Sequence, residues 1–208
     1  MHKPIAVASE PVSFVVAARQ NPALTIQASR ARVTSGQSLT VSGVVTGAHA
    51  APVTLLARSG GESFQEVAHT ATDGTGAFAF TQAPLANTTY LVRSDHIRSR
   101  ALFQPVSFAL SASASATSIA PGEAVTFSGS VGPPTGGQTV YLQRPDASGL
   151  GWHVVDTATV APDGRYAITH VLAGAQSTVL RVRVPPANGI QAASSQAFTI
   201  EVSQPPAA

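Results

Sequence analysis

Apolar and polar residues alternate along short stretches of this 208-residue chain, and a period of two is typical of strands with one buried face. Turn-forming pairs such as Asp73-Gly74 and Asn188-Gly189 separate the stretches. No stretch has the length and period of an ordinary helix, so we expect an all-β chain. The alternation predicts these inward-facing pairs: Leu39 and Val41, Val125 and Phe127, Val140 and Leu142, Phe78 and Phe80, Tyr166 and Ile168, Tyr90 and Val92, Leu180 and Val182, Phe108 and Leu110, Phe198 and Ile200.

The chain contains two copies of one pattern. Residues 35–43 align with residues 121–129 at an offset of 86, and the offset grows to 90 further on, as loop insertions would produce. Later matches, in order, are Leu56 with Leu142, Arg58 with Arg144, Val67 with Val155, Gly76 with Gly164, Val92 with Val182, Arg93 with Arg183, and Phe108 with Phe198. About seven short strands in each copy predict two tandem immunoglobulin-like β-sandwiches.

This repeat divides the chain into three parts. They are an N-terminal strand segment (1–19), a first sandwich (20–110) and a second sandwich (111–208). The strand through Phe108 and Leu110 runs directly into the opening strand of the next copy. Because such a junction has almost no linker, we expect little bending between the sandwiches.

The N-terminal segment predicts an extra strand. Residues 11–16 repeat the pattern of residues 105–110, so residues 5–18 resemble the closing strand of a third sandwich whose other strands are absent. Val12, Phe14 and Val16 would share one face, and an uncovered apolar edge invites pairing. We favour donation of this strand to a neighbouring subunit, or anchoring to a larger particle, over truncation or folding back onto the first sandwich.

The second copy carries the residues that suggest a family. They are Gly-x-x-Val-Thr-Phe-Ser-Gly-x-Val from Gly122, Val-Tyr-Leu-Gln-Arg from Val140, the lone Trp152, Asp-Gly-Arg-Tyr from Asp163, and Leu-Arg-Val-Arg-Val-Pro from Leu180. This succession resembles the immunoglobulin-like repeats of actinobacterial surface proteins. It covers nearly all of residues 111–203 and, more weakly, 20–110, where Phe64 stands near the place of Trp152. The resemblance implies spacing and display, and it supplies no ligand.

Charge and composition narrow the classes of partner. The net charge is only +2 and charged residues make up 11% of the chain, which argues against nucleic acid as a partner. Lys3 is the single lysine, and this bias fits a GC-rich coding genome. The chain has no cysteine and no apolar run long enough to span a membrane. We expect an extracellular or cell-surface location, with a phage virion as the alternative.

Residues that carry chemistry are scattered. The six histidines stand singly, and the turns at Asp73 and Asp163 each offer one acidic side chain, so no metal site is predicted. Serines lie outside nucleophile-elbow motifs, and the carboxylates fall mostly in turns. We therefore predict no catalytic residue, no cofactor and no enzymatic activity.

One loop and one aromatic residue are candidates for binding. Arg93, Arg98 and Arg100 cluster where a hairpin is predicted, and they could hold an anionic polymer or stay a solvated hairpin tip. Trp152 could stack on a sugar or lie half-buried in a strand. The leading hypothesis is a structural spacer whose partner is itself or a neighbouring protein subunit. The alternative is an adhesion module that binds cell-wall or other polysaccharide through its end loops.

Overall fold

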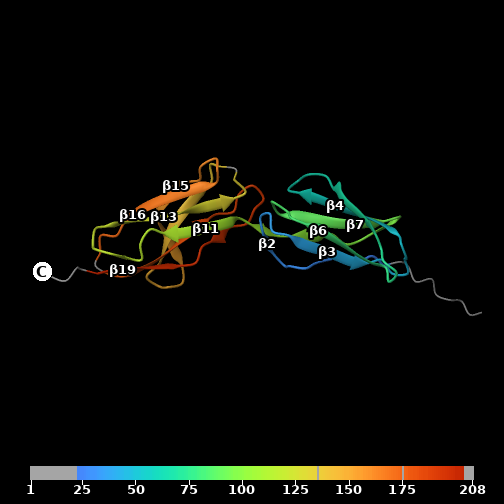
Figure 1. Cartoon of the computed structure of the whole chain (residues 1–208), viewed down its shortest axis with the longest axis horizontal. Coiled ribbons are helices and arrows are strands. Elements are labelled where there is room, and N and C mark those ends of the chain that lie inside the picture. Colours follow the sequence, from blue (N-terminus) through green and yellow to red (C-terminus); the bar gives the residue numbers. More distant parts are fainter. Residues whose placement is uncertain (1–22, 135, 175, 204–208) are drawn as a thin grey trace, which may run out of the picture.

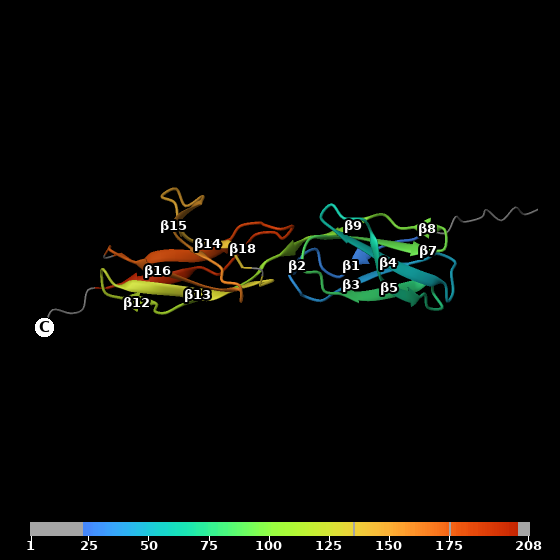
Figure 2. The same ribbon diagram turned by 90° about the horizontal axis from the view of Figure 1, so that it is seen from above.

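The computed structural model describes residues 23–134, 136–174 and 176–203. Two β-sandwiches follow each other along the long axis of the molecule (Figure 1, Figure 2). No helix occurs in the described residues, hence none that is long and apolar enough to cross a membrane. The fold is therefore all-β, with two tandem immunoglobulin-like sandwiches, which confirms the predicted fold class.

The first sandwich packs two layers of strands. Its strands are β1 (Gln27–Ala28), β2 (Val33–Thr34), β3 (Leu39–Val44), β4 (Pro52–Ser59), β5 (Gln65–Ala71), β6 (Ala77–Gln82), β7 (Thr88–Ser94), β8 (Ile97–Arg98), β9 (Leu102–Gln104) and β10 (Val106–Ser107). One sheet has the antiparallel order β1-β3-β6. The other has the order β5-β4-β7, with β8 and β9 both pairing with β7, while β10 runs parallel to β2.

The second sandwich repeats this topology. Its strands are β11 (Ala109–Ala114), β12 (Ser118–Ile119), β13 (Ala124–Gly132), β14 (Thr139–Pro145), β15 (Trp152–Thr159), β16 (Arg165–Val171), β17 (Thr178–Val184), β18 (Ala193–Ser194) and β19 (Phe198–Val202). One sheet has the order β11-β13-β16 and the other β12-β19-β17-β14-β15, with β18 beside β17. The parallel pairing of β12 with β19 matches that of β2 with β10. The sequence repeat is thus a structural repeat.

Each sandwich has its own apolar core between its sheets. The first core contains Val33, Leu39, Val41, Val45, Val53, Leu55, Phe78, Phe80, Tyr90, Val92 and Val106. The second contains Phe108, Ile119, Val125, Phe127, Val131, Val140, Leu142, Val160, Tyr166, Ile168, Leu180, Val182, Val184, Ile190, Ile200 and Val202. Most residues of the predicted inward pairs are buried here, whereas Leu110 and Phe198 are half-buried. Burial of these side chains is the main stabilising term for each copy.

The closing strand of the first sandwich corrects one match made from the sequence. Tyr90 pairs with Leu102 on β9, just as the equivalent Leu180 pairs with Phe198 on β19. Leu102 is therefore the counterpart of Phe198, and the match with Phe108 is wrong. Phe108 and Leu110, which we expected to close the first copy, pack in the second core instead.

A second correction concerns β4. Leu55 pairs with Val92, and Leu142 pairs with the equivalent Val182. Both leucines are fully buried and stand at the same β-bulge, so Leu142 matches Leu55 and not Leu56. The extra bulge residue breaks the strict alternation of inward and outward positions, which explains why the sequence pattern alone misplaced the match by one residue.

Candidate functional site

The junction between the two sandwiches is the best-defined candidate site for a structural role. Val106 is buried in the first core, and Phe108 is buried in the second. Only Ser107 stands between them, so the connection between the cores is a single residue. A connection this short leaves few backbone torsions about which one sandwich can turn on the other.

The connecting segment is bonded to the first sandwich. The backbone N–H of Ser35 donates to the carbonyl oxygen of Ser107 at 2.8 Å. The N–H of Val106 donates to the side-chain oxygen of Asn87 at 2.7 Å. These bonds hold the end of β10 in place, and the Asn87 side chain supplies an acceptor for a backbone group that is buried.

The same segment is bonded to the second sandwich. The N–H of Gln191 donates to the carbonyl of Val106 at 2.7 Å, and the N–H of Phe108 donates back to the carbonyl of Gln191 at 3.0 Å. A further bond crosses directly between the sandwiches, from the N–H of Asn87 to the carbonyl of Gly189 at 2.8 Å. The junction segment is therefore hydrogen-bonded to both sandwiches, and we call the bonds made by Gly189 and Gln191 the clasp.

An enlarged loop of the second sandwich makes this clasp. Between β7 and β8 the first sandwich has only Asp95 and His96, whereas residues 185–192 connect β17 to β18. The larger loop carries Gly189 and Gln191, and it buries Ile190 in the second core. Its six additional residues also change the numbering offset between the two copies, from 90 before the loop (Ser94 and Val184) to 96 after it (Ile97 and Ala193). Because the sequence alignment assumed an offset of 90 throughout this part, it missed the true match of the closing strands.

The three arginines proposed as a polyanion loop have different surroundings. Arg93 lies in β7 and forms an ion pair with Glu66 of β5. Arg98 lies opposite Arg93 in β8 and is exposed, as is Arg100. An anion that approaches this hairpin would therefore meet Arg98 and Arg100, while Glu66 offsets the charge of Arg93.

The equivalent face of the second sandwich has lost that acidic partner. Arg183 takes the place of Arg93, and Val154 takes the place of Glu66. Within the described residues, Arg183 has no salt bridge. This sheet face therefore carries a positive charge that is not offset by a neighbouring carboxylate.

A second arginine stands beside it. The guanidinium of Arg181 lies over the ring of Trp152 at 3.9 Å, and its Nε donates to Oε1 of Gln143 at 3.0 Å. Partial burial, followed by the charge of Arg183, lowers the pKa of Arg181. Sequence reasoning missed this pair, although the alternation Leu-Arg-Val-Arg-Val from Leu180 already predicts both arginines on one outward face.

Trp152 is half-buried within β15, in agreement with the simpler of its two interpretations. Because Arg181 covers one face of its ring, that face is closed to a sugar. The contact is a cation–π interaction, which fixes the direction of the guanidinium. Trp152 thus positions Arg181 rather than offering an open stacking platform on that side.

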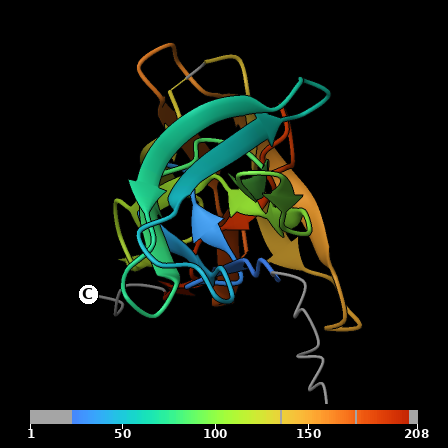
Figure 3. The ribbon, with the colours of Figure 1, turned by 90° about the vertical axis from the view of Figure 1, so that its right-hand side faces the viewer.

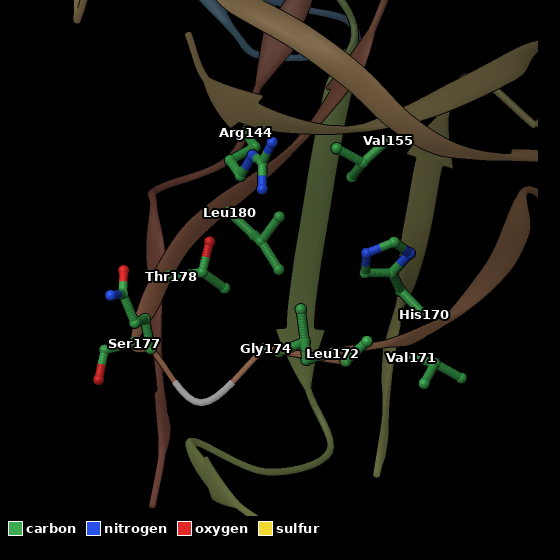
Figure 4. Close-up of a pocket in the computed structure, with 11 residues that line it drawn as sticks. Arg144, Val155, His170, Val171, Leu172, Gly174, Ser177, Thr178 and Leu180 are labelled. Atoms are coloured by element: carbon green, nitrogen blue, oxygen red, sulfur yellow. The ribbon is translucent and has the colours of Figure 1, made fainter. Parts of the chain in front are cut away.

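A hollow of about 440 Å³ opens between the ends of β16 and β17. Figure 4 shows Arg144 and His170 on two of its sides, with Leu180 between them. Both polar side chains already have partners: Nδ1 of His170 lies 3.3 Å from Oδ2 of Asp156, and Nε of Arg144 donates to Nε2 of His153 at 3.3 Å. Among the described residues that line the hollow, neither Ser177 nor Thr178 forms a hydrogen bond with His170, as an activated nucleophile would with its base.

The carboxylates of the turns at Asp73 and Asp163 accept hydrogen bonds within their own turns. Oδ1 of Asp73 accepts hydrogen bonds from the hydroxyl and the N–H of Thr75 and from the N–H of Ala77, at 2.7, 2.8 and 2.9 Å. These bonds, the Thr75 hydroxyl first, lower the pKa of Asp73. In the part of the chain that the structure describes, no three acidic or histidine side chains gather as a metal site would require.

Val12, Phe14 and Val16, the predicted strand-donation residues, lie outside the described residues. Donation of this segment to a neighbouring subunit stays a prediction.

No protein-family model matches the chain, and no curated protein matches it either. Among solved structures, a tetra-tandem repeat in the extending region of a large adhesion protein is similar, with 17% identity and a TM-score of 0.37. A protein described as membrane-anchored from Corynebacterium diphtheriae is similar with 10% identity and the same TM-score, 0.37. These matches cover 88% and 89% of this chain, but only 50% and 60% of the two structures.

Proposed function

We propose that this chain is a non-enzymatic structural spacer of a bacterial surface assembly, in which two sandwiches act as one stiff rod. The observation that carries the proposal is the junction, where residues 106–108 connect two cores through one intervening residue. Domains joined by ordinary linkers move relative to one another by default. A segment with hydrogen bonds to both sandwiches, as here, opposes that motion.

A surface location is part of the proposal. It rests on the resemblance of residues 111–203 to actinobacterial surface repeats, because the fold by itself indicates no location. A spacer needs length, stiffness and a protein surface that takes part in no reaction. The end-to-end arrangement in Figure 1 gives the length, and the clasped junction gives the stiffness.

Small-angle X-ray scattering of the intact chain tests the rod. A matched variant replaces residues 185–192 by Asp-His, the turn of the first sandwich, and so removes the clasp while keeping a turn that this fold accepts. The parent should scatter as one elongated body, and the variant should need an ensemble of bent shapes. A parent curve that only a broad ensemble fits would overturn the proposal.

A second candidate function is adhesion to an anionic cell-wall polysaccharide or teichoic acid. Its specific support is the pair Arg181 and Arg183, for which the described residues provide no salt bridge, and the exposed pair Arg98 and Arg100. Guanidinium groups bind phosphate and carboxylate groups through charge-assisted hydrogen bonds. The two pairs lie on different sandwiches, so substitutions can separate them.

Retention on purified cell wall at low salt tests this function. We expect salt-sensitive retention that falls several-fold in Arg98→Ala/Arg100→Ala or in Arg183→Ala, because screening weakens contacts between exposed charges. Arg165→Ala is the control, since Arg165 is exposed and pairs with Asp163 of its own turn. No retention of the parent, or equal loss in the control, would exclude specific adhesion through these residues.

A further inference from the structure

The first sandwich has an open hollow at the end that faces away from the second sandwich, the end seen in Figure 3. Its volume is about 240 Å³. It lies between the loop that follows β3 and the turn between β7 and β8, and its lining includes Val45, Ala48, Ala51, Ser94 and Ile97. Val45 and Ser94 belong to the buried residues, so the hollow reaches down to the core.

The equivalent residues of the second sandwich belong to a larger core. Val131 is the counterpart of Val45, and Val184 is the counterpart of Ser94. Both belong to the core cluster that also contains Phe108 and Ile190. Phe108 is 1% exposed and Ile190 is 6% exposed. The preceding segment and the enlarged loop, which are bonded to each other through Phe108 and Gln191, therefore each add one buried apolar side chain to the second core.

The first sandwich lacks both closing residues at the equivalent positions. Its two-residue turn, Asp95 and His96, leaves no counterpart of Ile190. At the offset of 86 that relates Leu24 to Leu110, the counterpart of Phe108 is Pro22. The end of the first sandwich that carries the hollow thus lacks the two apolar side chains that the second sandwich has at the equivalent positions.

The chain enters the first sandwich at the rim of this hollow. The N–H of Thr46, which lines the hollow, donates to the carbonyl of Ala23 at 3.0 Å. Ala23 therefore lies at the rim, and 22 residues precede it in the sequence. They include Pro11-Val12-Ser13-Phe14, which is identical to the junction segment Pro105-Val106-Ser107-Phe108.

We propose that Phe14 of the same chain occupies this hollow, just as Phe108 is buried in the second core. Phe14 lies eight residues further from Leu24 than Phe108 lies from Leu110, so the intervening residues would form a loop. The entropic cost of closing a loop rises only slowly with its length, so eight extra residues add little to it. A tethered side chain also competes well against the same side chain of another molecule, because its effective concentration is high.

This occupant corresponds to folding back onto the first sandwich, the alternative that the sequence pattern alone favoured less than strand donation. The hollow and the segment are both apolar, and each would otherwise leave hydrophobic surface exposed. With Phe14 in the hollow, the apolar surfaces of both the hollow and the segment are removed from water. The inference is independent of the spacer proposal, since the junction between the sandwiches keeps its bonds in either case.

Disulfide trapping tests the proposal cleanly, because the chain has no cysteine. The test variant is Ser13→Cys/Ala48→Cys in the full chain, which keeps Phe14 and places one cysteine in the lining of the hollow, and the matched control carries the same two cysteines together with Phe14→Ala. We expect the test pair to form an intramolecular disulfide under mild oxidation at least tenfold faster than the control. Non-reducing electrophoresis and mass measurement distinguish this product from crosslinked dimers.

Two results would overturn the proposal. Equal rates in the test and control pairs would mean that Phe14 has no preference for the hollow. Crosslinked dimers or ladders in the test pair alone would mean that the segment fills the hollow of a neighbouring molecule, which is strand donation. The scattering of the parent chain is a separate readout, so a failed rod and a failed occupant are distinguishable.

Discussion

At the scale of single residues, one glycine in each copy permits two strands to approach closely. A Cβ on Gly43 would lie 2.1 Å from the carbonyl oxygen of Thr25, and one on Gly129 would lie 2.0 Å from that of Ser111. Tyr166 makes use of the close approach, because its hydroxyl donates to the same Ser111 oxygen at 2.7 Å. The Ser-Gly pair repeated in the sequence thus marks the contact between β3 or β13 and the opening strand of its sheet.

Replacing either glycine by alanine should separate these strands. We expect Gly43→Ala and Gly129→Ala to lower the free energy of unfolding by about 1–3 kcal/mol or more, the usual cost of overpacking. Gly61→Ala is the control, since nothing lies within 4 Å of the added Cβ. Urea denaturation checks the difference, and equal effects at all three positions would contradict the close approach.

Two tyrosines in the cores should make the free energy of unfolding depend on pH in the alkaline range. Burial raises the pKa of Tyr90 and of Tyr166 to about 12, compared with 10.0 for an exposed tyrosine. The folded state therefore retains protons that the unfolded chain releases above pH 10, so the stability falls as the pH rises from about 10 to 12. The slope reaches roughly 1.4 kcal/mol per pH unit for each tyrosine.

Tyrosine-to-phenylalanine variants check this dependence. Tyr90→Phe should lose stability less steeply than the parent between pH 10 and 12, as measured by denaturant unfolding at fixed pH values. Tyr166→Phe should show the same shallower slope from a lower starting stability, because it lacks the hydrogen bond to Ser111. Parallel curves for all three proteins would show that these groups do not titrate in that window.

At the scale of elements, the sequence pattern located the strands well and the registers less well. The period of two identified the buried positions of β3 and β13 because each of these strands has one face on a core. Two features made this pattern give the wrong register elsewhere. A β-bulge displaced the match at Leu55, and six extra loop residues before β18 displaced the match of the closing strands. Neither feature changes the composition of the strands, so no periodicity reports it.

The exact position of the junction was also not predictable from the periodicity of the sequence. The sequence predicted a short connection after Leu110, but the crossing lies at Ser107, because Phe108 completes the second core. The clasp depends on backbone groups of Gly189 and Gln191. Backbone hydrogen bonds leave little trace in residue type, so only the turn signal of Asn188-Gly189 was visible beforehand.

The side chain of Asn87 accepts a hydrogen bond from the N–H of Val106, a fully buried residue of β10. Asn87→Ala removes this acceptor, and we expect a loss of about 1–3 kcal/mol, the cost of an unsatisfied buried polar group. Asn87→Asp keeps an acceptor and should lose less. Chemical denaturation measures both, and an equal loss in the two variants would contradict the role of the side-chain oxygen.

At the scale of the whole molecule, two complete sandwiches share one junction. The tandem arrangement was predictable because a repeat of about 90 residues with alternating strands has few other folds. The arginine pair at Arg181 and Arg183 and the hollow beside Val45 were not singled out from the sequence. Both become visible only when the copies are superposed by register and their differences are compared, Val154 against Glu66 and the two-residue turn against the larger loop.

The most direct test of the stiff rod is the distribution of distances between two spin labels, one on each sandwich. Cysteines at Ser63 and Ala147 are suitable sites, because both residues are exposed in turns and the chain has no other cysteine. Double electron–electron resonance should give one narrow distance peak for the parent and a broad distribution when residues 185–192 are replaced by Asp-His. A distribution in the parent as broad as in the variant would contradict the account.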